Sequence, residues 1–196
     1  EEPAYLDAVA RDLIEESAFS AGRPLESIFI GGGTPSLLSS AGLRRLLSTI
    51  GGLFELRRNI EITLEANPGV ADGERFLAYR EAGVTRLSLG VQSLAPTSLH
   101  RLGRIHDGDQ ARRAMSLAMG AGFTDVNVDL MFGIPGQDLA QAQADLREVI
   151  GFGPSHISYY QLTLEPNTPY FSDPPELPAE SVTESIHRAG VKTLRR

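Results

Sequence analysis

Cysteine is absent from this chain of 196 residues. Without it, the chain can form no disulfide and supplies no thiolate for catalysis, for zinc or for an iron–sulfur cluster. Positive charge is scarce as well, with 18 lysine and arginine residues against 25 aspartate and glutamate residues and a net charge of −7. This balance gives no basic footprint for nucleic acid or an anionic membrane. We therefore expect a small ligand rather than a polyanion as the main partner.

Long hydrophobic runs are also missing. No apolar stretch approaches the roughly 18 to 20 residues of a membrane span. The first residues, Glu1 to Ala4, contain neither an initiator methionine nor a signal-peptide pattern, which suggests a fragment of a longer protein. The length suits one sizeable domain or most of one, because domains cluster at roughly 100 to 200 residues.

Short apolar runs alternate with amphipathic stretches at a nearly constant interval. The runs predict strands over residues 27–30, 59–65, 84–89, 124–131 and 156–162. The stretches predict helices over residues 5–17, 40–50, 72–82, 107–121, 138–150 and 179–194. Strand centres recur every roughly 30 to 40 residues, the length of a β–α–β unit, which predicts a parallel sheet. In this α/β fold we expect consecutive parallel strands to carry Ile28, Ile62, Leu87, Val128 and Ile157.

A cluster of prolines follows the last predicted strand, at positions 166, 169, 174, 175 and 178. Proline removes a backbone donor and fixes the backbone, so this composition predicts an extended linker before the last helix. We therefore predict a domain boundary after residue 165, with one domain over residues 1–165 and, over residues 166–196, a proline-rich linker and the start of a C-terminal region.

The loops distinguish an open nucleotide-binding sheet from part of a β/α barrel. The dinucleotide fingerprint needs G-x-G-x-x-G at the start of a helix, whereas residues 31–35 read Gly-Gly-Gly-Thr-Pro and precede their helix by several residues. No phosphate-loop lysine pattern is present either. The barrel interpretation places functional groups at the carboxyl ends of the strands.

Polar or glycine residues lie at or just after this end of each predicted strand. Each has a structural explanation: the glycines suit a tight turn, Glu65 an ion pair, Gln92 a loop hydrogen bond, Asp129 a helix cap and Arg104 a solvated charge. Together they are more typical of a concave site for a small ligand with hydroxyl and carboxylate groups. The four histidines show no metal-ligand spacing, so a histidine metal site is not expected.

Six segments in this region resemble the radical-SAM superfamily, in the branch of oxygen-independent coproporphyrinogen III dehydrogenase (oxidase) and the haem chaperone HemW. They are residues 29–35 (FIGGGTP), 61–68 (EITLEANP), 86–93 (RLSLGVQS), 102–106 (LGRIH), 127–137 (NVDLMFGIPGQ) and 158–168 (SYYQLTLEPNT). The resemblance implies a partial (β/α)6, TIM-like barrel with a parallel sheet, which binds S-adenosylmethionine over a [4Fe–4S] cluster.

The resemblance also implies roles for individual residues. Backbone groups of Gly32, Gly33 and Thr34 match the contacts with the methionine amino group. The acidic, amide and arginine contacts fall on Glu65, Gln92 and Arg104, with Arg104 facing the ligand carboxylate. Asp129 matches the acceptor for the ribose hydroxyls, and Thr163 matches a position beside the adenosyl group.

One departure from the family is large, because its cluster is held by a CxxxCxxC loop after a first barrel strand and this chain has neither. We therefore expect a missing first strand, an open edge beside the strand that ends at Ile30, and no activity for the chain alone. The segment from Tyr159 to Thr168 looks more like the chaperone than like the dehydrogenase. The resemblance thus implies a cytoplasmic protein that carries haem to acceptor proteins.

Two alternatives stay open. A dehydrogenase of porphyrin biosynthesis would be an oxidoreductase that removes hydrogen and CO2 from a porphyrinogen by radical chemistry. Its substrate carries four propionates, which call for several arginine or lysine residues, whereas Arg104 is the main candidate near the predicted site. An unrelated β/α-barrel lyase with an anionic substrate would explain the architecture but not the six segments.

Overall fold

A computed structural model describes residues 1–20, 22–70, 73–123 and 125–195. Its strands are β1 (Leu25–Ile30), β2 (Leu56–Ala66), β3 (Arg86–Gln92), β4 (Asp125–Phe132) and β5 (His156–Gln161). Its α-helices are α1 (Glu2–Ser17), α2 (Ser40–Leu53), α3 (Gly73–Ala82), α4 (Pro96–Arg101), α5 (Gly108–Gly120), α6 (Leu139–Gly151), α7 (Pro169–Ser172) and α8 (Glu180–Leu194). Three short 3-10 helices are η1 (Ala18–Ser20), η2 (Pro35–Leu37) and η3 (Pro68–Val70).

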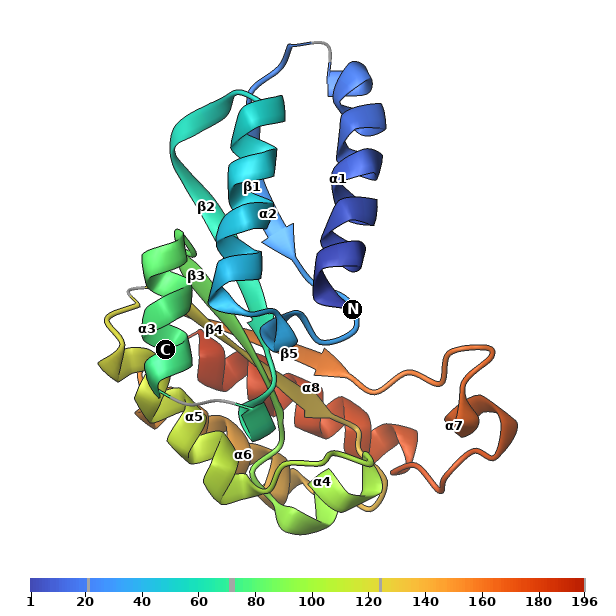
Figure 1. The fold of residues 1–196 in the computed structure, drawn as a ribbon. Helices are drawn as coiled ribbons and strands as arrows, with labels where there is room; N and C mark the ends of the chain where they lie inside the picture. Colours follow the sequence, from blue (N-terminus) through green and yellow to red (C-terminus); the bar gives the residue numbers. More distant parts are fainter. Residues whose placement is uncertain (21, 71–72, 124, 196) are drawn as a thin grey trace.

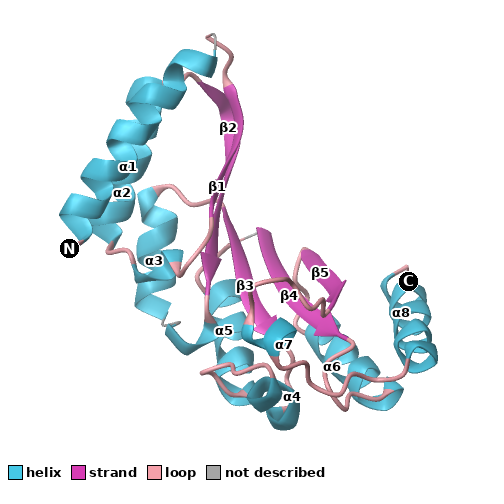
Figure 2. Ribbon diagram, turned by 90° about the vertical axis from the view of Figure 1, so that its right-hand side faces the viewer, coloured by secondary structure: helices cyan, strands magenta, loops and turns pink. Residues whose placement is uncertain are grey.

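The five strands form one parallel sheet in the order β1-β2-β3-β4-β5. The prediction of consecutive parallel strands is confirmed, because Ile28 pairs with Ile62 and Val128 pairs with Ile157. The sheet curls, and the long helices cover its convex side, as Figures 1 and 2 show. This arrangement is part of a β/α barrel whose concave side carries the inward-facing side chains.

Both ends of the sheet are open edges within the described residues. β1 pairs with β2 alone, and β5 pairs with β4 alone. The expected edge beside the strand that ends at Ile30 is therefore present. Such an edge leaves backbone donors and acceptors available for another strand.

Helix starts follow capping chemistry. Asp107 and Asp138 each accept a hydrogen bond from the backbone N–H three residues later, in capping boxes completed by Gln110 and Gln141. The predicted first residues of these two helices are therefore N-caps, and α5 and α6 begin one residue later. The predicted starts at Asp72 and Thr124 lie outside the described residues.

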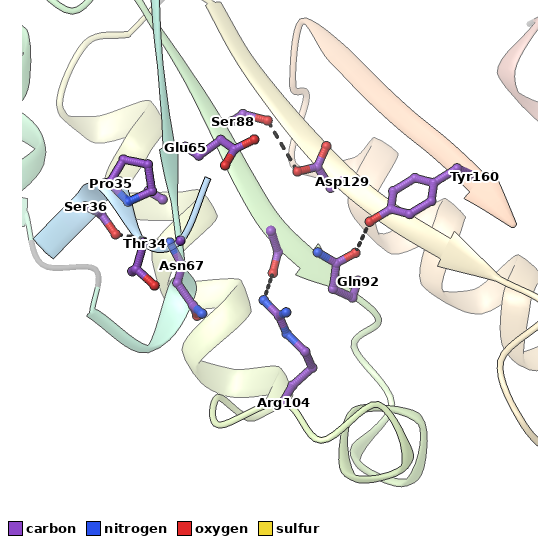
Figure 3. Close-up of a pocket in the computed structure, with 13 residues that line it drawn as sticks. Thr34, Pro35, Ser36, Glu65, Asn67, Ser88, Gln92, Arg104, Asp129 and Tyr160 are labelled. Carbon is purple, nitrogen blue, oxygen red and sulfur yellow. Dashed lines mark hydrogen bonds between the residues drawn. The ribbon is translucent and has the colours of Figure 1, made fainter. Parts of the chain in front are cut away.

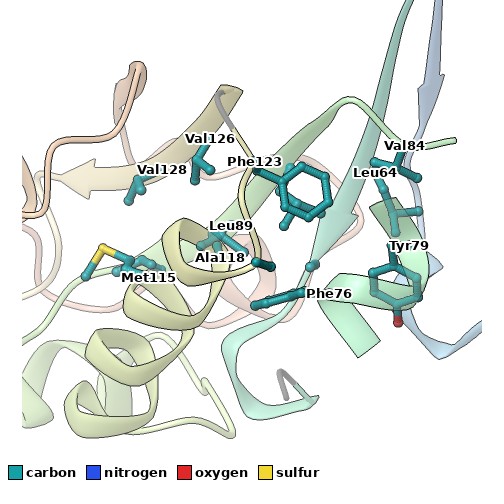
Figure 4. Packing of buried hydrophobic residues seen from close by; sticks show 14 of the residues in the cluster. Leu64, Phe76, Tyr79, Val84, Leu89, Met115, Ala118, Phe123, Val126 and Val128 are labelled. Atoms are coloured by element: carbon teal, nitrogen blue, oxygen red, sulfur yellow. The ribbon is translucent and has the colours of Figure 1, made fainter. Parts of the chain in front are cut away.

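The main core lies between the convex face of the sheet and helices α2, α3, α5 and α6. Figure 4 shows the part of this core that packs against α3 and α5. Leu64 and Leu89 are fully buried on the strands, and Phe76 and Met115 face them from α3 and α5. Burying each such side chain contributes about 1.5–3 kcal/mol relative to leaving it exposed. The packing holds successive strands in register and so fixes where their carboxyl ends lie.

The C-terminal residues differ in part from the predicted linker. The short helix α7 lies within the proline-rich segment. A second short helix that the apolar periodicity did not reveal is α4, which lies between β3 and α5. α8 packs against α6, and Thr193 Oγ1 donates a hydrogen bond of 3.1 Å to Gln143 Oε1. The domain boundary after residue 165 stays a prediction. Among the described residues, no helix combines the length and the apolar character needed to cross a bilayer.

Candidate functional site

A cavity of about 380 Å³ lies at the carboxyl edge of the sheet, on its concave side (Figure 3). The segments that line it follow or end β1, β2 and β3, and further lining residues come from β4, β5 and the loop after α4. The lining residues are Gly33, Thr34, Pro35, Ser36, Glu65, Ala66, Asn67, Ser88, Gly90, Gln92, Arg104, Asp129 and Tyr160. Six of the eight predicted ligand residues therefore surround one space.

The glycine segment after β1 makes a close backbone approach. Gly32 and Gly33 have φ angles of 83° and 56°. Residues with a Cβ rarely adopt such angles, so both positions favour glycine. A Cβ at Gly31 would lie 2.6 Å from the Phe29 ring and 3.0 Å from the Glu65 carboxylate. The three glycines thus form a turn and also leave room beside Glu65.

Gly32 lies outside the cavity lining but is tied to it. Its backbone N–H donates to Glu65 Oε2 over 3.1 Å. Glu65 lies on the same face of β2 as Thr63 and Glu61, as strand alternation predicts, and Thr63 Oγ1 donates to Glu61 Oε1 over 3.1 Å. The carboxylate of Glu65 therefore faces the cavity with one oxygen held by the glycine turn.

The end of β3 brings an amide and a guanidinium together. Gln92 is the last residue of the strand and has a φ of 68°, which is uncommon for a residue with a side chain. Arg104 Nη2 donates to the Gly90 carbonyl over 3.4 Å, and Arg104 Nε is buried with no hydrogen-bond partner among the described residues. Of the described lining residues, Arg104 carries the one positive charge.

Asp129 lies in the middle of β4 rather than at its end, which corrects the sequence prediction. It caps no helix, because Asp138 holds that position for α6. Its Oδ1 accepts from Asn127 Nδ2 over 2.8 Å, and its Oδ2 accepts from Ser88 Oγ over 3.3 Å. The sequence places Asp129 on the correct strand. Its side chain reaches the cavity from the concave face of the sheet and not from the end of the strand.

A set of hydrogen bonds around Asn127 fixes the position of Asp129 on the concave face. Asn127, which is 2% exposed, also donates to Ser88 Oγ over 2.8 Å. Its Oδ1 accepts from His156 Nδ1 over 2.6 Å and from Ser158 Oγ over 3.0 Å. We call Ser88, Asn127, Asp129, His156 and Ser158 the inner polar cluster. With the amide in this orientation, Nδ1 of His156 carries the proton.

Tyr160 was not predicted as a site residue. Its hydroxyl donates to Gln92 Oε1 over 2.6 Å across β4 (Figure 3). Burial raises the pKa of Tyr160, and the negative charge of Asp129 raises it further, so the hydroxyl keeps its proton at neutral pH. The sequence could have indicated Tyr160 as a site residue, because it lies two residues after Ser158 and therefore on the same inward face of the strand.

Three other lining residues with polar side chains were also missed. Ser36 comes from η2 and Asn67 from the residue that follows β2, and Asn67 N–H donates to Ser36 Oγ over 3.5 Å. Ser88 could have been found from strand alternation, because it shares the inward face of β3 with Gly90.

Thr163 does not line the cavity. It is exposed, and its hydroxyl donates to Glu165 Oε1 over 2.9 Å. Two arginines near the site in sequence also point elsewhere: Arg86 donates to Thr63 Oγ1 over 3.3 Å, and Arg101 donates to the Pro135 carbonyl. The convergence predicted from the sequence therefore holds for the cavity lining and Gly32, with Thr163 outside.

His106 has a structural environment beside the site. It is 2% exposed, and its Nε2 lies 3.1 Å from the Val91 carbonyl oxygen. Burial lowers the pKa of His106, so the neutral ring with a proton on Nε2 is the form that fits this contact. The ring holds the loop before α5 against the end of β3.

The cavity offers donors and acceptors in separate places. Arg104 lies beside Gly90, to whose carbonyl it donates, whereas the carboxylates of Glu65 and Asp129 lie on neighbouring parts of the concave face (Figure 3). A guanidinium binds a carboxylate, and carboxylates accept from ammonium and hydroxyl groups. This arrangement suits a small ligand that combines these three groups.

Comparison with known proteins gives a family match over most of the chain. The model of the radical SAM superfamily matches residues 4–149. The heme chaperone HemW of Escherichia coli is 46% identical over 190 residues, which are 97% of this chain and 50% of that protein. The heme chaperone HemW of Haemophilus influenzae is 48% identical over 172 residues, 88% of this chain and 45% of that protein.

A solved structure has the same fold over nearly the whole chain. Coproporphyrinogen III oxidase (HemN) from Escherichia coli, described as a radical SAM enzyme, superposes with a TM-score of 0.87 at 26% identity. The alignment covers 99% of this chain and 45% of that one. The chain spans about half the length of the curated relatives it matches.

Proposed function

This chain belongs to the radical SAM superfamily, and from that membership we propose that its cavity binds S-adenosylmethionine. The observation that carries the proposal is the lining itself, in which one guanidinium and two carboxylates surround a space of about 380 Å³. S-adenosylmethionine carries a carboxylate, an ammonium group and two ribose hydroxyls, which match these groups in kind.

Each part of the ligand has a proposed partner. Arg104 and Gln92 bind the carboxylate, and backbone groups of Gly32, Gly33 and Thr34 meet the amino group beside Glu65. Asp129 accepts from the ribose hydroxyls, with its carboxylate aligned by the inner polar cluster. Thr163 is retained as a neighbour of the adenosyl group, although it lies outside the cavity lining.

The superfamily implies a [4Fe–4S] cluster, but the residues of this chain do not fit one. The chain has no cysteine, and its described residues contain no group of three or more histidine, aspartate or glutamate side chains that could hold a metal ion. The ligands of a cluster would have to come from outside these residues. A reduced cluster, together with S-adenosylmethionine, would supply a carbon-centred radical.

For the whole protein we propose a haem chaperone that delivers haem to acceptor proteins. Identity of 46–48% to two proteins named as heme chaperones supports this function. The cavity also contains a single positive charge among its described lining residues, Arg104, which the S-adenosylmethionine carboxylate would use. This leaves no cluster of cations for a substrate with four propionates.

The alternative is an oxygen-independent coproporphyrinogen III dehydrogenase. The TM-score of 0.87 to a coproporphyrinogen III oxidase favours it, at a lower identity of 26%. The two functions differ in outcome, because the dehydrogenase releases CO2 from propionates and the chaperone leaves its cargo chemically unchanged.

The ligand site is tested by calorimetry on the full-length protein. Asp129→Ala should weaken S-adenosylmethionine binding by about 1–3 kcal/mol, the scale for losing a charged hydrogen-bond partner. Asp125→Ala is the matched control, because Asp125 is exposed on the same strand and lies outside the cavity lining. Equal affinities for the two variants would contradict the assignment of Asp129.

Turnover distinguishes the chaperone from the dehydrogenase. Full-length protein with reconstituted cluster, reductant and S-adenosylmethionine is incubated with coproporphyrinogen III, and protoporphyrinogen and CO2 are measured. We expect haem binding without decarboxylation. Multiple turnovers to protoporphyrinogen would establish the dehydrogenase instead.

A further inference from the structure

Tyr160 and Gln92 meet above β4 although they come from strands that are not neighbours. The Tyr160 hydroxyl, on β5, donates to Gln92 Oε1, on β3, over 2.6 Å (Figure 3). Tyr160 is 40% exposed, whereas Gln92 is 8% exposed. The hydrogen bond therefore joins a partly exposed ring at the cavity rim to a buried amide, and it occupies the oxygen end of that amide.

The nitrogen end of the same amide lies above Gly90. A Cβ built on Gly90 would be 3.2 Å from Gln92 Nε2 and 3.5 Å from Arg104 Nη2. Glycine at this position lets the amide and the guanidinium approach the same part of the strand. Both groups are hydrogen-bond donors, and both line the cavity.

We propose that Tyr160 is a positioning residue that holds the Gln92 amide with Nε2 toward the cavity, so that Gln92 and Arg104 together select ligands with a carboxylate. The inference rests on the proposed function and adds a determinant of specificity to it. An amide can turn through 180° at little cost in shape, and only its hydrogen bonds decide which end faces a ligand.

The hydroxyl of Tyr160 matters because the turned amide would compete with the ligand. Without that hydroxyl, Gln92 Oε1 can turn toward the Arg104 guanidinium and accept from it. Such an internal hydrogen bond would replace a donor with an acceptor and occupy the cation at the same time. A nucleoside ligand without a carboxylate would lose nothing by this turn.

Two ligands separate these effects without needing a cluster. S-adenosylhomocysteine has an amino-acid group with a carboxylate, and 5′-methylthioadenosine keeps the nucleoside and thioether but lacks that group. Binding of both to full-length Tyr160→Phe is measured by calorimetry. We expect the affinity for S-adenosylhomocysteine to fall about tenfold, the scale of one hydrogen bond to a charged group. The affinity for 5′-methylthioadenosine should change by no more than about twofold, because a substitution that does not interact with the ligand alters binding by no more than this.

The control is Tyr159→Phe, the same substitution on the adjacent residue. Tyr159 faces the opposite side of β5, and its buried hydroxyl has no hydrogen-bond partner among the described residues. This variant should bind both ligands as the wild type does. A double variant supplies the coupling: with Gln92→Leu already present, Tyr160→Phe should cause no further loss.

The outcomes separate the inference from the function on which it rests. If the wild type prefers S-adenosylhomocysteine and Tyr160→Phe keeps the full preference, the positioning role is overturned while the ligand site stands. An equal loss for both ligands would also overturn it, because Tyr160 would then support the cavity generally. If the wild type binds neither ligand, the proposed S-adenosylmethionine site fails and the inference fails with it.

Discussion

Replacing Asn127 by leucine removes the amide at the centre of the inner polar cluster while nearly keeping its volume. The amide donates to Ser88 Oγ and Asp129 Oδ1, each over 2.8 Å. It accepts from His156 Nδ1 over 2.6 Å and from Ser158 Oγ over 3.0 Å. One substitution therefore deletes four hydrogen bonds that link β3, β4 and β5 on the concave face.

The expected cost follows from what each partner can do afterwards. Ser158 is only partly buried and His156 is exposed, so water can replace their lost contact. Ser88 and Asp129 keep their hydrogen bond to each other, but Asp129 Oδ1 loses its donor and then lies beside an apolar side chain. Net contributions of about 1 kcal/mol for a neutral hydrogen bond and about 1.5–3 kcal/mol for one to a charged group give a loss of about 2–4 kcal/mol.

Urea unfolding followed by far-ultraviolet circular dichroism measures this loss. Ser158→Ala is the graded control, because it removes one of the four hydrogen bonds and should cost about 1 kcal/mol. The affinity for S-adenosylhomocysteine should fall in Asn127→Leu, since Asp129 is no longer aligned. If Asn127→Leu costs no more than Ser158→Ala, the cluster is not held by this amide and the reasoning is wrong.

Four further substitutions test burial and packing by urea unfolding. Burial raises the pKa of Asp145 above its ordinary value of 3.8, so the folded state binds that proton more tightly and the free energy of unfolding falls as pH rises through the raised pKa. Asp145→Asn lacks this loss, and its stability relative to the wild type should increase from about pH 4 to pH 7. Burial lowers the pKa of His106 below 6.5, so the folded state loses stability as pH falls below that value, and His106→Gln should not show this loss. A Cβ at Gly190 would overlap the Tyr159 ring, so Gly190→Ala should cost about 1–3 kcal/mol by overpacking. Gly52→Ala, with no atom within 4 Å, should instead stabilise α2 by up to about 1 kcal/mol.

The repeating β–α unit could be predicted from the sequence because it rests on local patterns. Apolar periodicity distinguishes strands from helices, and a strand–helix–strand connection of this length is nearly always parallel and right-handed. The short helix α4 escaped prediction, since its six residues are too few to show an amphipathic period. The acidic caps at Asp107 and Asp138 set helix starts to within one residue.

The edge of the sheet that carries the site also followed from the sequence. Parallel strands end at one edge, so polar residues after different strands meet there whatever the detailed packing. Gly33, Thr34, Glu65, Gln92 and Arg104 line the cavity for this reason. Their roles toward a ligand stay predictions that binding experiments test.

The sequence by itself determined the order of the strands and the edge of the sheet at which the cavity lies. Only the tertiary structure decided which side chains touch across that edge. Tyr160 reaches Gln92 across an intervening strand and 68 positions of sequence, and Thr163, three residues later, lies outside the cavity lining. Such distances depend on how strongly the sheet curls and on a register shift between β3 and β4 near Gln92. Curl and register arise from the packing of all the helices against the sheet, which no local pattern encodes.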